Sequence, residues 1–128
     1  MPERQGIWPL PGFDLPLLPL GVEGGITRAF NNMQKLADLL AEHSIPLTIV
    51  VYPWANQVFY DDRESPQIAI WRAFCVKNCR AFINLFPAFL AEKDVHKDWY
   101  NRLFIDGDVH FSAGGHSLMF RELAKRLL

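Results

Sequence analysis

The sequence is poor in the features that mark several common protein classes. It has two cysteines in 128 residues, too few for a disulfide-rich scaffold. Charge of one sign is also missing, because 13 basic and 14 acidic residues leave a net charge of −1. No run of Lys and Arg forms the basic stripe that is typical of nucleic-acid-binding proteins. We therefore expect no nucleic-acid partner.

Long hydrophobic runs are absent as well. Apolar stretches such as 45–54 are far shorter than the roughly 20 residues that a membrane-spanning helix needs. The N-terminus has no basic segment followed by a long apolar one, so it does not have the pattern of a signal peptide. We expect no membrane span, and the sequence leaves the cellular compartment undetermined.

What the sequence does contain is enough apolar material for a core. Half of the residues are hydrophobic, 21% are charged, and ten Phe and four Trp are present. This composition is typical of a globular chain rather than a disordered one. The length predicts one domain, or part of one.

The chain divides into two regions by its proline content. Five of the nine Pro lie in the first nineteen residues, and Pro fixes φ and removes an amide donor. We therefore expect residues 1–24 to be an irregular arm and 25–128 to be the folded part. There the patterns predict helices at 27–43, 65–78, 95–103 and 112–127, a helical turn at 87–92, and buried strands at 47–52 and 81–86.

Helices that alternate with buried strands indicate an α/β fold with a parallel sheet. Two strands make a poor sheet, because a stable one usually has about four or more. The chain thus has the content of half a sheet domain, with an unpaired strand edge that invites pairing with another chain. We expect a homo-oligomer formed through that edge, or pairing with a missing N-terminal half.

Asp108 and His110 are the strongest candidates for chemistry. They lie in the loop before the final helix, whose positive dipole end favours the neutral imidazole that a general base needs. An Asp two residues earlier can reach the other ring nitrogen, hold the tautomer and stabilise the imidazolium. The alternative is that Asp108 caps a turn and His110 is an ordinary surface residue.

Further candidate residues lie outside this pair. Trp54, Asn56 and Gln57 follow the first strand, where ligands bind in open α/β sheets, so they are candidate substrate-binding residues or else packing and loop residues. Asp106, Asp108, His110 and His116 offer metal-ligand types without a defined fourth ligand, so we predict no metal and no cofactor.

Cys75 and Cys79 are four residues apart on an expected helix. Side chains at that spacing lie roughly 6 Å apart between Cβ atoms, too far for an unstrained disulfide unless Cys79 lies past the helix end. We predict two buried free thiols.

The segment from Asp108 to His116, Asp-Val-His-Phe-Ser-Ala-Gly-Gly-His, resembles the C-terminal block of SGNH (GDSL-type) hydrolases. Its Asp-x-His spacing is similar to that of SGNH-like proteins associated with polysaccharide O-acetylation. The resemblance covers about residues 7–128. It implies a partial three-layer α/β/α, flavodoxin-like domain with Asp108 and His110 as catalytic acid and base. It also implies a carbohydrate or small-molecule ester as substrate, and relatives of this type are often exported.

The Gly-Asp-Ser block that carries that family's nucleophile is absent from this sequence. The only serines are Ser44, Ser65, Ser112 and Ser117, and none lies on a turn from a strand into a helix. Two hypotheses follow. The chain is the C-terminal half of an ester hydrolase or O-acyltransferase whose nucleophile lies elsewhere, or it is a degenerate, non-catalytic module that binds a partner or a ligand.

Overall fold

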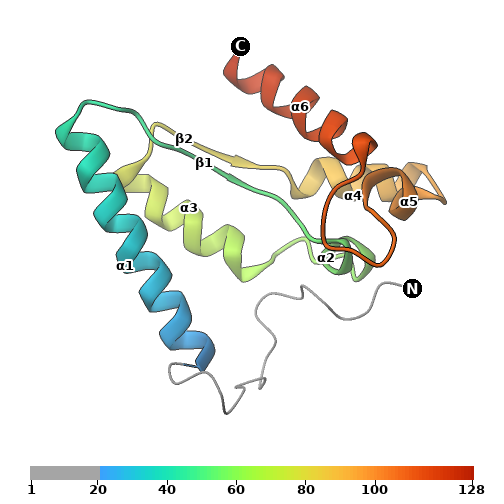
Figure 1. Cartoon of the computed structure of the whole chain (residues 1–128), viewed down its shortest axis with the longest axis horizontal. Helices are drawn as coiled ribbons and strands as arrows, with labels where there is room; N and C mark the ends of the chain where they lie inside the picture. The colour runs from blue at the N-terminus through green and yellow to red at the C-terminus, as the bar shows by residue number, and fades with distance from the viewer. Residues whose placement is uncertain (1–20) are drawn as a thin grey trace.

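The computed structural model describes residues 21–128, so the part of the expected arm that falls on residues 1–20 lies outside the described residues. The described residues are mixed α/β and mostly helical, at 65% (Figure 1). The elements are α1 (Gly21–Glu42), β1 (Thr48–Val51), α2 (Ala55–Phe59), α3 (Pro66–Asn78), β2 (Ala81–Asn84), α4 (Phe86–Val95), α5 (Trp99–Leu103) and α6 (Ala113–Leu127).

The two strands form a parallel pair at the centre of the fold. Their register aligns Thr48 with Ala81 and Val51 with Asn84. Parallel strands need a long crossover, and α2 and α3 supply it. α3 packs against both strands and α1 packs against α3, while α4, α5 and α6 pack together beyond the carboxyl ends of the strands (Figure 1). The predicted parallel α/β arrangement is confirmed to this extent.

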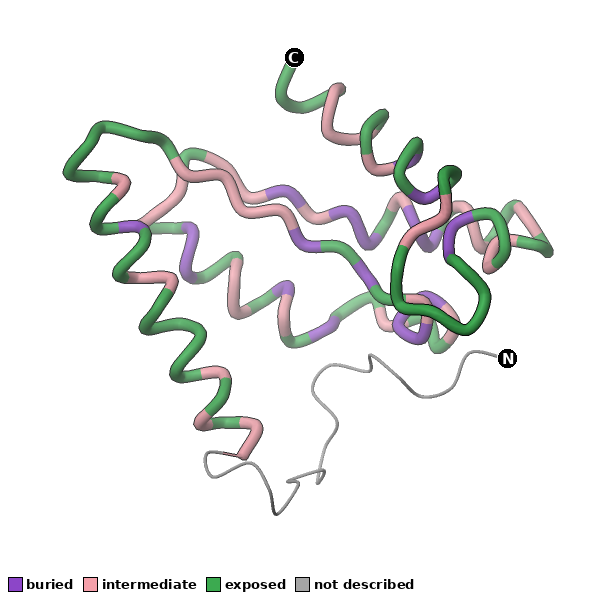
Figure 2. Tube along the Cα trace, in the orientation of Figure 1, coloured by how far each residue is buried: buried purple, intermediate pink, exposed green. Residues whose placement is uncertain are grey.

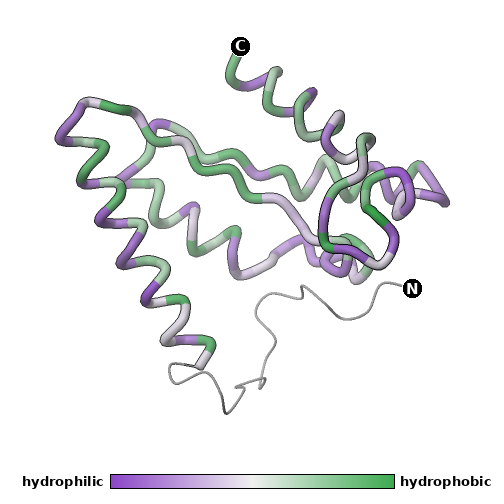
Figure 3. Tube along the Cα trace, in the orientation of Figure 1, coloured by the Kyte–Doolittle hydropathy of each residue, from purple (hydrophilic) through white to green (hydrophobic). Residues whose placement is uncertain are grey.

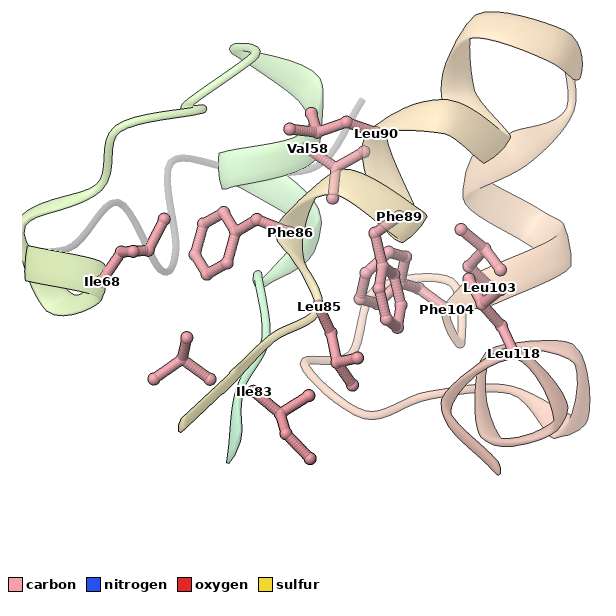
Figure 4. Close-up of a cluster of buried hydrophobic side chains, with 11 residues drawn as sticks. Val58, Ile68, Ile83, Leu85, Phe86, Phe89, Leu90, Leu103, Phe104 and Leu118 are labelled. Atoms are coloured by element: carbon pink, nitrogen blue, oxygen red, sulfur yellow. The ribbon is translucent and has the colours of Figure 1, made fainter. Parts of the chain in front are cut away.

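The main core lies at the carboxyl ends of the strands and under α4. Phe86, Phe89 and Phe104 are almost fully buried there, together with Leu85 and Val58 (Figure 4). Burying one such side chain stabilises the fold by about 1.5–3 kcal/mol. The core is therefore concentrated next to the loop that carries the candidate catalytic pair.

A smaller cluster joins α1 to α3. It consists of Ala37, Phe74 and Cys75, with Met33 and Trp71 packed around it. Figure 2 shows that most of α1 is exposed, and Ala37 is its only buried residue. α1 is thus attached to the rest of the described chain along a narrow contact.

The strands are less enclosed than their sequences indicate. Figure 3 shows β1 as largely hydrophobic, yet three of its four residues are only half-buried. The expectation of a strand covered on both faces is therefore wrong for most of β1. The reason is that few helices are available to cover a two-stranded sheet, and burial becomes complete only where the strands run into the α4 core.

α1 begins at Gly21, six residues earlier than predicted, so residues 21–24 of the expected irregular arm form its first turn. Each glycine in a helix costs about 1 kcal/mol relative to alanine. Extending a helix that has already nucleated is still far easier than starting one. Gly24 and Gly25 therefore do not stop the helix.

The prediction of two free thiols is wrong, because Cys75 and Cys79 form a disulfide. Cys79 is the residue that ends α3, and its backbone is extended (φ −119°, ψ 150°). It therefore leaves the helical path, and the two Cα atoms lie 4.5 Å apart, within the range that a disulfide spans.

Candidate active site

The loop between α5 and α6 is closed at its base by a short backbone pairing. Phe104 and Phe111 form an isolated antiparallel bridge, and the Ile105 amide donates to the His110 carbonyl at 3.0 Å. Gly107 sits at the tip with φ of 72°, a left-handed conformation that glycine adopts without strain. Residues 105–110 thus form a tight, hairpin-like loop.

Phe111 anchors this loop to the core. Its ring stacks on Phe89 at 5.2 Å between centroids and contacts Phe104 at 5.4 Å and Tyr52 at 5.3 Å. Tyr52 directly follows β1, so the contact brings the carboxyl end of that strand beside the loop. His110, which precedes Phe111, is therefore held near the strand end where ligands bind in open α/β sheets.

The start of α6 fixes the other side of the loop. The Ser112 hydroxyl accepts from the Gly115 amide at 3.3 Å and donates to the Arg102 carbonyl, which confirms Ser112 as the predicted N-cap. A Cβ on Gly114 would collide with the Arg102 carbonyl oxygen, and one on Gly115 would collide with that of Leu103. The two glycines let α6 approach the α5 backbone this closely.

Asp108 and His110 meet as predicted. His110 Nδ1 and Asp108 Oδ1 lie 2.7 Å apart. The same carboxylate oxygen accepts from the backbone amides of Val109, at 2.6 Å, and His110, at 3.3 Å. These contacts are those expected of a carboxylate that orients an imidazole through Nδ1.

The His110 side chain is 75% exposed, so the pair is open to solvent rather than part of the core. The hydrogen bond from His110 lowers the pKa of Asp108 below its ordinary value, and the Val109 amide adds to the effect. The carboxylate therefore stays ionised across the neutral range. With Nδ1 engaged, Nε2 is the ring atom left to exchange a proton with a bound molecule.

The three predicted substrate-binding residues separate into two groups. Trp54 is 45% exposed and can meet a ligand from solvent. Asn56 and Gln57 lie on α2, a five-residue helix that the sequence pattern did not indicate, and are only 1% and 2% exposed. Their burial removes them from direct contact with a ligand in solution.

Gln57 has a structural task instead. Its side-chain oxygen accepts from the Trp54 amide at 2.9 Å, and its amide group donates to Ser65 Oγ at 2.9 Å. It thereby ties the start of α2 to the start of α3. Sequence reasoning missed this role, because an isolated Gln carries no signal of burial.

None of the four serines has the placement of a nucleophile. Ser65 is buried and bound by Gln57, Ser112 is the α6 cap, and Ser117 accepts from Arg121 on α6 at 3.3 Å. Ser44 lies in the turn after α1 with a left-handed backbone.

Within residues 21–128, no group of three or more His, Cys, Asp or Glu side chains is placed to hold a metal ion. Asp106 and His116 therefore do not join Asp108 and His110 in a metal site. Across the same residues, no helix combines the length and the apolar character needed to cross a bilayer.

Two surface hollows stand out in the described part of the chain. One, of about 330 Å³, is apolar and lies between α1 and α3, where Phe30 and Ile70 line it. The other, of about 290 Å³, lies between α4, α5 and α6, and its lining includes the charged residues Glu92, Arg102 and Arg121. Neither has Asp108 or His110 in its lining.

Comparisons with protein families, with curated proteins and with solved structures find no match to this chain.

Proposed function

We propose that this chain is the C-terminal half of an SGNH-type ester hydrolase or O-acyltransferase that acts on acylated carbohydrate. The observation that carries the proposal is the 2.7 Å contact between His110 Nδ1 and Asp108 Oδ1. The loop that holds them is closed by backbone pairing and anchored by Phe111, so the two side chains are oriented before any ligand arrives. The complete domain in this proposal has a three-layer α/β/α arrangement.

In this proposal His110 is the general base. Its Nε2 takes the proton from a serine hydroxyl as that serine attacks the ester carbonyl, and later returns the proton to the leaving alcohol. Asp108 holds the ring and stabilises its charged form. Trp54, exposed beyond the end of β1, offers an aromatic face against which a sugar ring can pack.

The nucleophile comes from outside this chain, because the four serines lie in a turn, in caps or on α6. Removing one member of such a triad removes most of its acceleration, since the members act as a unit. An in-frame Gly-Asp-Ser block upstream of Met1 would support a single polypeptide. A serine supplied by another subunit would enter through the edge of the two-stranded sheet, where strand pairing is unfilled in residues 21–128.

Hydrolysis of p-nitrophenyl acetate tests the role of His110. This ester is activated, so an imidazole can attack it directly, form an acetyl-imidazole and release p-nitrophenolate before water restores the ring. We expect a saturable rate that His110→Ala abolishes and Asp108→Asn lowers. His43→Ala is the matched control, because His43 is another exposed histidine, located just past α1.

A rate unchanged in His110→Ala would refute a role for His110 in this chain. A rate that rises linearly with ester concentration and falls equally in His43→Ala and His110→Ala would favour the alternative. In that alternative the chain is a non-catalytic module that binds a partner or a ligand.

The unfilled edge of the two-stranded sheet also favours the non-catalytic alternative, because a partner strand can pair there. Light scattering that shows a monodisperse monomer at high concentration would contradict pairing through the edge.

A further inference from the structure

The hollow between α4, α5 and α6 has two arginines in its lining. Arg102 from α5, Ser117 and Arg121 from α6 and Glu92 from α4 all line it. Leu103 and Leu118 also line it but are almost fully buried, at 3% and 4% exposed. Two guanidinium groups against one carboxylate leave this lining with a net positive charge.

The Arg102 guanidinium has no partner among the described residues. Among residues 21–128, no acidic group or hydrogen-bond acceptor pairs with its guanidinium, although its backbone carbonyl holds the α6 cap. Arg121 is only loosely engaged, with Nη2 3.9 Å from a Glu92 carboxylate oxygen and Nη1 3.3 Å from Ser117 Oγ. Since Ser117 Oγ accepts that bond, its own proton is left to donate elsewhere.

The other cations on α6 differ. Lys125 and Arg126 both pair with Glu122, at 2.6 and 3.1 Å, and neither lines the hollow. In both pairs the cation forms a salt bridge with a carboxylate on the same helix. Within the described part of the chain, no carboxylate lies that close to Arg102 or Arg121.

We propose that this hollow binds a small molecule that carries a carboxylate or phosphate group. The guanidinium group is a planar fork of donors that matches the oxygens of either anion. The hollow, about 290 Å³, is at the small end of the range for ligand sites, which suits a ligand of few atoms. The site uses neither Asp108 nor His110, so it stands whether or not the chain takes part in acyl transfer.

The test is a titration of the full chain with inorganic phosphate, acetate and butyrate, followed by the amide NMR signals of Leu103, Gly114 and Ser117. We expect saturable shifts confined to this region. Acetate and butyrate should bind with similar affinity, because Leu103 and Leu118 are buried and the anionic group makes the contact. Tighter binding of phosphate than of both carboxylates would identify phosphate as the anion, and the reverse order would identify carboxylate.

Variants decide whether the arginines form the site. Arg102→Gln and Arg121→Gln should each weaken binding about tenfold, the size of one charge-assisted hydrogen bond in a partly exposed position. Arg126→Gln removes the same charge from α6 outside the hollow and should leave binding within twofold. Glu92→Gln should tighten binding about threefold, because it frees Arg121 from a competing carboxylate.

A misfolded variant would bind the anion more weakly, so tighter binding by Glu92→Gln cannot come from misfolding. This variant therefore separates a loss of the binding site from a loss of the fold. Shifts that stay linear with anion concentration, or that Arg126→Gln reduces as much as Arg102→Gln does, would mean an adventitious ion only and would overturn the proposal. A Glu92→Gln variant that binds no more tightly than the parent would also contradict it.

Discussion

Replacing Gly115 by alanine should destabilise the protein, although alanine is the better helix former. The added Cβ would collide with the carbonyl oxygen of Leu103 and come within 2.9 Å of the Phe111 Cβ. One obstacle is a backbone oxygen and the other is a Cβ, whose position the backbone fixes, so neither can swing away and α6 itself has to move. Overpacking of this kind costs up to about 3 kcal/mol, occasionally more. Alanine in place of glycine returns about 1 kcal/mol of helix propensity. The expected net loss is therefore up to about 2 kcal/mol.

Gly25→Ala is the matched control. Gly25 is also helical, in α1, but no atom lies within 4 Å of the position that an added Cβ would occupy. The same substitution should stabilise the protein there by about 0.5–1 kcal/mol. Urea unfolding followed by circular dichroism measures both changes in the free energy of unfolding. If both variants were stabilised by similar amounts, α6 would not approach α5 as described, and the positioning of the His110 loop by that contact would be refuted.

Two further predictions concern the titration of Asp108 and the disulfide. The pKa of Asp108 is lowered mainly by the His110 side chain, so His110→Ala should raise it toward the ordinary value of 3.8, measured by NMR of the carboxyl carbon against pH. Because the pKa of the folded state is the lower one, the contribution of the pair is complete above pH 4 and is lost as the pH falls through the folded-state pKa. An Asp108 pKa unchanged in the variant would contradict the contact. Reduction of the bond between Cys75 and Cys79 should cost at most about 2 kcal/mol, because the loop it closes is short. Alkylation of both thiols in the native protein without a reductant would show that the bond does not form.

The elements with local start signals were predictable from the sequence. Ser65 and Pro66 place the start of α3, and Ser112 places the start of α6, where the expected and observed starts agree within a residue. Such signals act within one turn of chain, and in α3 and α6 no distant contact overrides them. The two strands were predictable for a related reason, since their apolar runs are bounded by Pro53 and by a turn.

The missed features depend on contacts between segments far apart in sequence. α2 has only five residues, and its buried Val58 and Gln57 are held by α4 and by Ser65, which no local pattern reveals. The disulfide forms because α3 ends at Asn78, one residue before Cys79, and a pattern read from sequence does not place a helix end that accurately. The Asp108 and His110 contact was predictable, because a two-residue spacing in a loop already brings the side chains within reach. The charged hollow was not, because Arg102 and Arg121 come from separate helices.

The anchoring of the loop has a consequence for protein engineering. The tripeptide from Asp108 to His110 owes its geometry to the bridge beneath it, to the Phe111 ring and to the glycine-mediated contact between α5 and α6. Grafting three residues onto a foreign scaffold would therefore transfer the side chains without their orientation. The smallest transplantable unit runs from Tyr100, whose hydroxyl accepts from the Gly107 amide, to Leu118. The recipient would also have to supply an aromatic surface in place of Tyr52 and Phe89.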